Sequence, residues 1–125
     1  MKAQLILIAG PYRSGTDGDA QRIADNLQRL EQAALEVYQR GHVPVIGEWL
    51  ALPLAAAAGS TRHGDAICEE YLYPVAHRLI AQCQAVYRIA GASAGADKDL
   101  LLANEWGLKV YHHLEEIPLA TLTAC

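Results

Sequence analysis

A short apolar run near the start of the chain most constrains what this sequence can fold into. The run Leu5–Ala9 contains no polar residue and ends at the glycine-containing segment 10–16. An unbroken apolar run of this length predicts a strand that is buried on both faces, as at the centre of a parallel sheet. We therefore expect segment 10–16 to lie at the carboxyl edge of that sheet, where α/β folds bind ligands.

Segment 10–16 has the chemistry of a ligand-binding loop. It holds two glycines, two hydroxyls, the phenol of Tyr12 and the guanidinium of Arg13. Glycine lets the backbone approach a ligand closely, and arginine suits phosphate. The segment has neither the Gly-Lys-Ser/Thr of a P-loop nor the Gly-x-Gly-x-x-Gly of dinucleotide-binding loops. From local chemistry alone, a ligand loop and a tight strand-to-helix turn remain equal alternatives.

The next segments alternate between helical and extended patterns. Apolar residues recur at helical spacing over 19–40, and Gly41 provides a stop signal. Residues 42–46 read as a second strand, and Pro44 predicts an edge position because it lacks an amide donor. Similar patterns predict strands over 85–89 and 108–111 and a helix over 96–106.

The middle and the end of the chain are less regular. Residues 49–58 are expected to be helical in part, and 59–64 to form a loop. Asp65 is a plausible N-cap for the next helix, in which Pro74 either introduces a kink or begins a second helix. A short final helix is expected over 117–122.

This alternation of strands and helices predicts one α/β domain over residues 1–125. We expect a mostly parallel sheet of about four to five strands, with right-handed crossovers and helices on both faces. The first strand is expected at the centre. A ligand crevice between the first and third strands would bring segments 10–16 and 91–99 side by side.

Composition excludes several classes of partner. A net charge of −4 gives no electrostatic support for nucleic-acid binding. The apolar stretch 49–58 is too short to span a bilayer, so we expect no membrane partner. Three cysteines, an odd number with no Cys-x-x-Cys pair, favour reduced thiols in the cytoplasm.

No metal or cofactor is expected from the sequence. His112 and His113 with Glu115 and Glu116 have metal-ligand chemistry, but adjacent strand residues point to opposite faces. A solvated loop is the favoured interpretation. Cys68 and Cys83 are interpreted as small buried residues because neither has an evident activating partner.

Candidate chemistry gathers after the second and third strands. Ser93 and Asp99 flank the start of a helix, where serine is a common cap and an acid suits the helix dipole. The functional alternative is that Asp99 points into the crevice as a carboxylate nucleophile. Glu48 and Trp49 follow the second strand, where they could contact a base; core packing of Trp49 is equally compatible with the sequence.

Three stretches resemble the nucleoside 2-deoxyribosyltransferase-like superfamily, and within it a group of small bacterial domains of unknown function. Residues 8–12, Ile-Ala-Gly-Pro-Tyr, are similar to the opening strand and loop of the family. Asn26 and residues 41–44, Gly-His-Val-Pro, resemble its first helix and second strand. Residues 93–99, Ser-Ala-Gly-Ala-Asp-Lys-Asp, resemble the family's Ser/Asp-x-Gly-x-x-x-Glu segment.

This resemblance implies a three-layer flavodoxin-like, N-(deoxy)ribosyltransferase-like fold and a set of roles. It places Asp99 at the position of the family's Glu, which attacks the anomeric carbon of a 2-deoxyribose. It also implies a nucleoside or nucleotide as small-molecule partner and a homo-oligomer with shared sites. Together with the positions after the second strand, the expected substrate-binding residues are Gly10, Pro11, Tyr12, Arg13, Ser14, Glu48, Trp49, Ser93 and Gly95.

Two departures from the family pattern leave the function with two alternatives. Asp99 is one methylene shorter than the family's Glu, and the acid expected in the helix before the third strand falls near Ala76, where no acid is present. The leading interpretation is an N-glycosidic-bond enzyme, a deoxyribosyltransferase or a deoxynucleoside 5′-monophosphate N-glycosidase. The alternative is a non-catalytic nucleotide-binding or sensing domain of the same fold.

Overall fold

Among the residues that the structure describes, four parallel strands form one sheet of an α/β fold. The computed structural model describes residues 1–62 and 64–120. The sheet order is β2-β1-β3-β4, so the apolar first strand is central and Pro44 lies in an edge strand, as predicted. Ile6 pairs with Pro44 on one side and with Ala85 on the other. The strands are β1 (Leu5–Ala9), β2 (Val43–Ile46), β3 (Ala85–Arg88) and β4 (Lys109–Tyr111).

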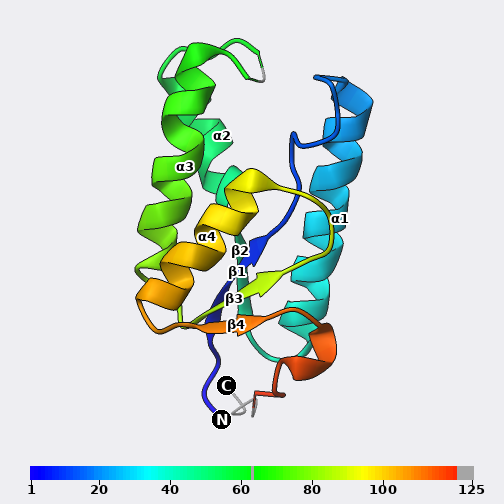
Figure 1. The fold of residues 1–125 in the computed structure, drawn as a ribbon, viewed down its shortest axis with the longest axis vertical. Coiled ribbons are helices and arrows are strands. Elements are labelled where there is room, and N and C mark those ends of the chain that lie inside the picture. The colour runs from blue at the N-terminus through cyan, green and yellow to red at the C-terminus, as the bar shows by residue number, and fades with distance from the viewer. Residues whose placement is uncertain (63, 121–125) are drawn as a thin grey trace.

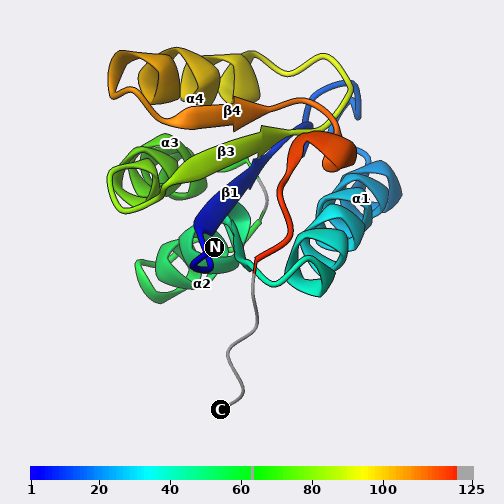
Figure 2. The ribbon, with the colours of Figure 1, turned by 90° about the horizontal axis from the view of Figure 1, so that it is seen from below.

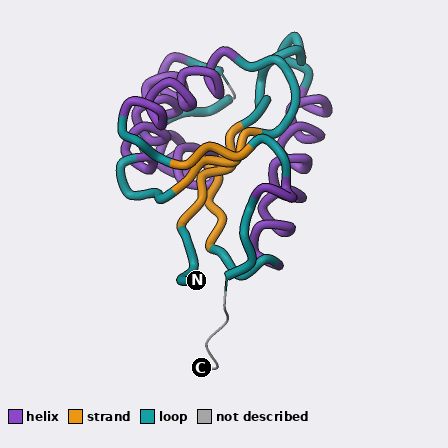
Figure 3. The backbone as a smooth tube through the Cα atoms, turned by 60° about the horizontal axis from the view of Figure 1, so that its bottom comes forward, coloured by secondary structure: helices purple, strands orange, loops and turns teal. Residues whose placement is uncertain are grey.

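The helices cover the sheet on two faces, which makes the fold three-layered. The helix α1 lies on one face, together with the chain after β4, while the other three helices lie on the opposite face (Figure 1, Figure 2). The tube view shows the twisted strands enclosed between these two layers (Figure 3). The helices are α1 (Ala20–Gln39), α2 (Gly47–Ala57), α3 (Ala66–Ile80), α4 (Ala94–Glu105) and the 3₁₀ turn η1 (Leu114–Glu116).

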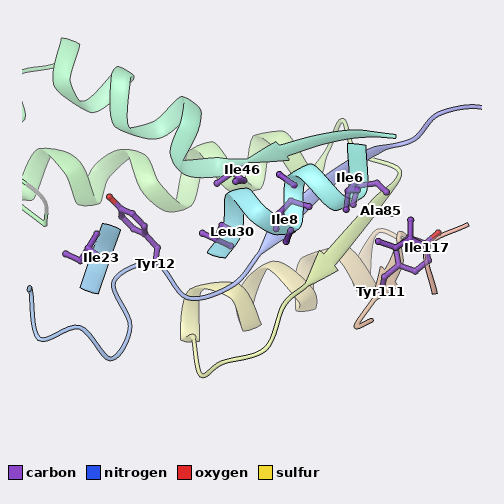
Figure 4. Close-up of a cluster of buried hydrophobic side chains, with 12 residues drawn as sticks. Ile6, Ile8, Tyr12, Ile23, Leu30, Ile46, Ala85, Tyr111 and Ile117 are labelled. Carbon is purple, nitrogen blue, oxygen red and sulfur yellow. The ribbon is translucent and has the colours of Figure 1, made fainter. Parts of the chain in front are cut away.

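The core is aliphatic and divided by the sheet. On the α1 face, Ile6 and Ile8 pack with Leu30 and Ile117, and Tyr12 joins this cluster beside Ile23 (Figure 4). On the other face, side chains of alternate strand residues meet α3 and α4. Each residue of β1 from Ile6 onward is buried, which explains why the run contains no polar side chain.

The predicted caps determine where the helices begin. The Asp65 carboxylate accepts a hydrogen bond from the Cys68 amide at 2.8 Å, and the Ser93 hydroxyl accepts one from the Ala96 amide at 3.2 Å. Asp19 caps α1 in the same manner. Pro74 lies inside α3, which continues from Ala66 to Ile80 as one helix.

The prediction of a final helix over 117–122 is wrong for its described part. Residues 117–120 are not helical; a 3₁₀ turn precedes them at Leu114–Glu116. Ile117 is extended, with φ −80° and ψ 117°, because the residue before a proline avoids the helical region. Residues 121 and 122 lie outside the described part of the chain.

Two further properties concern the helices and the thiols. Among the described residues, no helix combines the length and apolar character that crossing a bilayer requires. Cys68 and Cys83 are buried free thiols, and burial raises the pKa of Cys83 to about 11. The burial of both thiols and the raised pKa of Cys83 agree with the interpretation of these cysteines as packing residues rather than nucleophiles.

Candidate functional site

A cleft opens at the carboxyl end of β1. It lies between the loop after β1, the first turn of α2, the side of α3 and the first turns of α4, and has a volume of about 130 Å³. This is the crevice position expected for a parallel sheet. Its polar side chains are those of Tyr12, Arg13, Ser14, Glu48, Glu69, Tyr73, Ser93 and Asp99.

Asp99 is the least exposed acidic residue of the cleft. The residue is only 9% exposed and lies in the second turn of α4. Burial is the main cause that raises its pKa from 3.8 to about 7, and the charge of Glu48 raises it further, while Arg88 opposes the shift. Asp99 therefore carries a proton for part of the time at neutral pH, which an exposed aspartate does not.

Glu48 supplies a second carboxyl group to the same cleft. It lies in the first turn of α2, immediately after β2, and burial raises its pKa. Its charge acts on both Asp99 and Tyr12. Two buried acids in one cleft disfavour simultaneous ionisation, so they are expected to titrate as a pair.

His77 approaches Asp99 from α3. Its Nε2 lies 3.9 Å from Asp99 Oδ1, and within the described chain neither of these two buried atoms has a hydrogen-bond partner. The separation exceeds a hydrogen bond, and a rotation of either side chain would close it. The His77 side chain is 42% exposed, but the ring nitrogen that faces Asp99 is buried.

Arg13 is held by an ion pair across the mouth of the cleft. Its Nη1 lies 2.6 Å from Glu69 Oε1 on α3. A Cβ at Gly64 would come within 2.3 Å of Arg13 Nη2, so the guanidinium lies directly against the Gly64 backbone. Glu69 thereby connects α3 to the loop after β1.

The loop after β1 is shaped by groups outside the cleft. The Asn26 side-chain amide donates to the Tyr12 carbonyl at 2.9 Å. Gly10 has no room for a side chain, because a Cβ there would come within 2.4 Å of Ile89. Burial and the charge of Glu48 raise the pKa of Tyr12 to about 12, so its hydroxyl keeps its proton at neutral pH.

The start of α4 is fixed by Ser93 and Arg88. Ser93 is buried and caps the helix. The Arg88 guanidinium donates to the Gly91 carbonyl at 2.8 Å and lies 3.2 Å from Asp97 Oδ1. Asp97 points away from the cleft with an exposed side chain, so the first acid of this helix supports the loop and Asp99 faces the cleft.

Most of the predicted site residues line one cleft. Those brought together are Gly10, Tyr12, Arg13, Ser14, Glu48, Ser93, Gly95 and Asp99. Pro11 lies outside it, buried against the β3–α4 loop. Trp49 also lies outside it: its indole Nε1 donates to Glu31 on α1 at 2.9 Å, and the residue is half-exposed.

Five lining or supporting residues of α3 were not predicted as members of the site: Glu69, Leu72, Tyr73, Ala76 and His77. The Ala76 methyl lines the cleft. Residues 69, 73, 76 and 77 have the i, i+4, i+7, i+8 spacing that brings them to one side of a helix. That spacing was visible in the sequence, but the side that faces the cleft was not.

The described residues contain no group of three histidine, cysteine, aspartate or glutamate side chains arranged to hold a metal ion. The Glu116 carboxylate accepts hydrogen bonds from the His112 and His113 amides at 2.7 and 2.8 Å, and so acts as a turn cap. The sequence matches no model of a known protein family and no curated protein.

Proposed function

We propose that this protein cleaves an N-glycosidic bond of a nucleoside, nucleotide or related small molecule, with Asp99 as the nucleophile. The observation that carries this proposal is the buried Asp99 carboxyl in the cleft, with the second carboxyl of Glu48 near enough to affect its ionisation. Paired carboxyls in a desolvated cleft are the usual equipment for glycosidic chemistry. The resemblance to deoxyribosyltransferase-like proteins supports the same assignment.

The two acids divide the reaction between them. An Asp99 oxygen forms a bond to the anomeric carbon while the bond from that carbon to the base nitrogen breaks. Glu48 gives its proton to the leaving base. Water or a second base then attacks the anomeric carbon, passes a proton to Glu48 and releases Asp99.

The reactive form of the pair carries its one proton on Glu48 rather than on Asp99. A proton donor needs a raised pKa, which burial gives Glu48, whereas Asp99 acts only when ionised. Because the charge of Glu48 raises the pKa of Asp99, the proton of the pair lies mainly on Asp99 in the free protein, and the reactive form is the minor one. We expect the pair to share one proton in the reactive form, because like charges at close range suppress each other's ionisation.

Ala76 favours a second candidate function, binding without turnover. Its methyl lines the cleft where an acid helps hold substrate in the resembling family. In this alternative the protein is a nucleotide-binding or sensing domain. Tight binding of a nucleoside or nucleotide with no base release over long incubation would favour this alternative.

Base release from a panel of nucleosides and nucleotides, measured by chromatography, tests the proposal. Asp99→Asn is expected to lower turnover by about a thousandfold or more, because the nucleophile is lost. Asp97→Asn is the matched control, since Asp97 lies on the same helix with an exposed side chain outside the cleft. Unchanged turnover in Asp99→Asn would refute the nucleophile assignment.

We further propose a cytoplasmic location and a homo-oligomer. The buried free thiols of Cys68 and Cys83 suit a reducing compartment. Exposed apolar side chains on α2, those of Trp49, Leu50 and Leu54, offer a surface for self-association. Light scattering of the purified protein tests the second point, and a monomer across the accessible concentration range would contradict it.

A further inference from the structure

The charges of the cleft are unevenly distributed. Three carboxyl groups line it, those of Glu48, Glu69 and Asp99. Among the described residues that line it, Arg13 is the one cation, and its Nη1 is already engaged by Glu69 at 2.6 Å. A phosphate that enters this cleft therefore meets three carboxyl groups and a single guanidinium, whose Nη1 is already paired with Glu69.

The Arg13–Glu69 pair is geometrically constrained. The guanidinium lies against the backbone of Gly64 on one side and against Glu69 on another. Both side chains are between one third and one half exposed, so the pair itself contributes little to stability. The ion pair affects ligand choice because the Glu69 carboxylate already occupies Arg13. An anion that binds Arg13 must first displace this carboxylate and then remain beside it.

Glu69 engages one of the five N–H donors of Arg13, so other donors remain for a ligand. Arg13 Nε is buried and has no hydrogen-bond partner within the described chain. Buried donors are normally satisfied, so an acceptor from a ligand is expected there. A sugar hydroxyl or a base carbonyl oxygen would satisfy it without adding charge to a cleft that already holds three acids.

We propose that Glu69 is a specificity-determining residue: by holding Arg13 in an ion pair, it excludes ligands with a phosphate at this end of the cleft and selects uncharged glycosides. The inference rests on the proposed function only in identifying the selected ligands as glycosides. The exclusion of phosphate rests on the ion pair and on the excess of carboxyl groups over cations in the cleft, and it does not depend on the reaction. Arg13, expected from the sequence to contact phosphate, is then a neutralised side chain that orients an uncharged group.

Inorganic phosphate is the probe that separates these roles, since it carries the charge without the sugar. Binding is measured by calorimetry and by thermal shift at constant ionic strength, with chloride as the reference salt. The parent protein is expected to show no phosphate-specific stabilisation. Glu69→Gln keeps the size of the side chain and removes its charge, and is expected to bind phosphate about tenfold or more tightly than the parent.

Two controls assign the effect to Arg13 and Glu69. Glu70→Gln makes the same change in net charge at the adjacent exposed position and is expected to behave as the parent. Adding Arg13→Gln to Glu69→Gln is expected to abolish the gained phosphate binding. Circular dichroism confirms that each variant is folded.

The possible results are decisive for this inference and independent of catalysis. Phosphate binding by the parent that depends on Arg13 would overturn it, and so would a Glu69→Gln variant with no gain. Loss of turnover in Asp99→Asn with phosphate binding by the parent would uphold the proposed function and refute the role of Glu69. Unchanged turnover in Asp99→Asn, with no phosphate binding by the parent, would refute only the assignment of Asp99 as the nucleophile.

Discussion

At the scale of single residues, Asp99 has a consequence for stability as well as chemistry. Its pKa is about 7 in the folded protein against an ordinary value of 3.8, and burial is the main cause. Between pH about 4 and 7, the unfolded chain has lost this proton while the folded chain keeps it. The contribution of Asp99 to the free energy of unfolding therefore falls as pH rises through that window.

Replacing Asp99 by asparagine removes this pH dependence. We predict that Asp99→Asn becomes more stable relative to the parent as pH rises from 4 to 7, by no more than about 4 kcal/mol. Urea denaturation at a series of pH values measures the difference between the two proteins. A difference that stays constant with pH would show that Asp99 titrates normally. Asp97→Asn is the control, because its carboxylate is exposed.

At the scale of elements, the start of α4 depends on a single hydroxyl. Ser93 is buried and satisfies the Ala96 amide, one of the donors that a helix leaves unpaired at its first turn. Ser93→Ala is predicted to lower the free energy of unfolding by about 1 kcal/mol. Ser93→Asp is the control, since its carboxylate also caps a helix. Equal losses in both variants would point to packing rather than capping.

The elements themselves follow from local sequence, and so does half of the site. Several local patterns each have one physical interpretation: the apolar run of β1, the cap residues Asp65 and Ser93, and Pro44 at a sheet edge. The loop after β1 and the start of α4 meet because both follow neighbouring parallel strands. Topology alone therefore predicts that Arg13 and Asp99 face one cleft.

The contribution of α3 could not be predicted, because it depends on how that helix is rotated about its axis. Glu69 on a helix has the same local pattern whether it faces water or an arginine from another segment. His77 is likewise ordinary until Asp99 is found 3.9 Å from its Nε2. The packing of α2 against α3, with Gly47 close to Ala76, sets that rotation, and no short sequence pattern encodes it.

At the scale of the whole molecule, the chain after β4 completes one layer. The ring of buried His42 contacts both ends: Nδ1 accepts from the Gln4 amide at 3.0 Å, and Nε2 lies 2.6 Å from the Pro118 carbonyl oxygen. Arg40 Nη1 donates to the Ile117 carbonyl oxygen at 3.0 Å. The segment is thereby fixed beside α1, with Ile117 fully buried.

The packing of this layer predicts different losses of stability for two nearby substitutions. Ile117→Ala removes a fully buried side chain from the α1-face cluster and is expected to cost about 2–5 kcal/mol. Leu119→Ala, two residues later and 69% exposed, is expected to change stability by no more than about 0.5 kcal/mol. Guanidinium denaturation distinguishes them; equal effects would mean that the segment does not belong to the folded core.

The central position of β1 also has a consequence during synthesis. β1 precedes in the sequence every strand that flanks it, and its neighbours β2 and β3 follow only after α1 and α3 respectively. On the ribosome, both edges of the fully apolar β1 segment therefore stay unpaired until residues distant in the sequence have been synthesised. We expect nascent chains that end before residue 85 to expose Leu5–Ala9 to chaperones, and chains that include β3 to protect it.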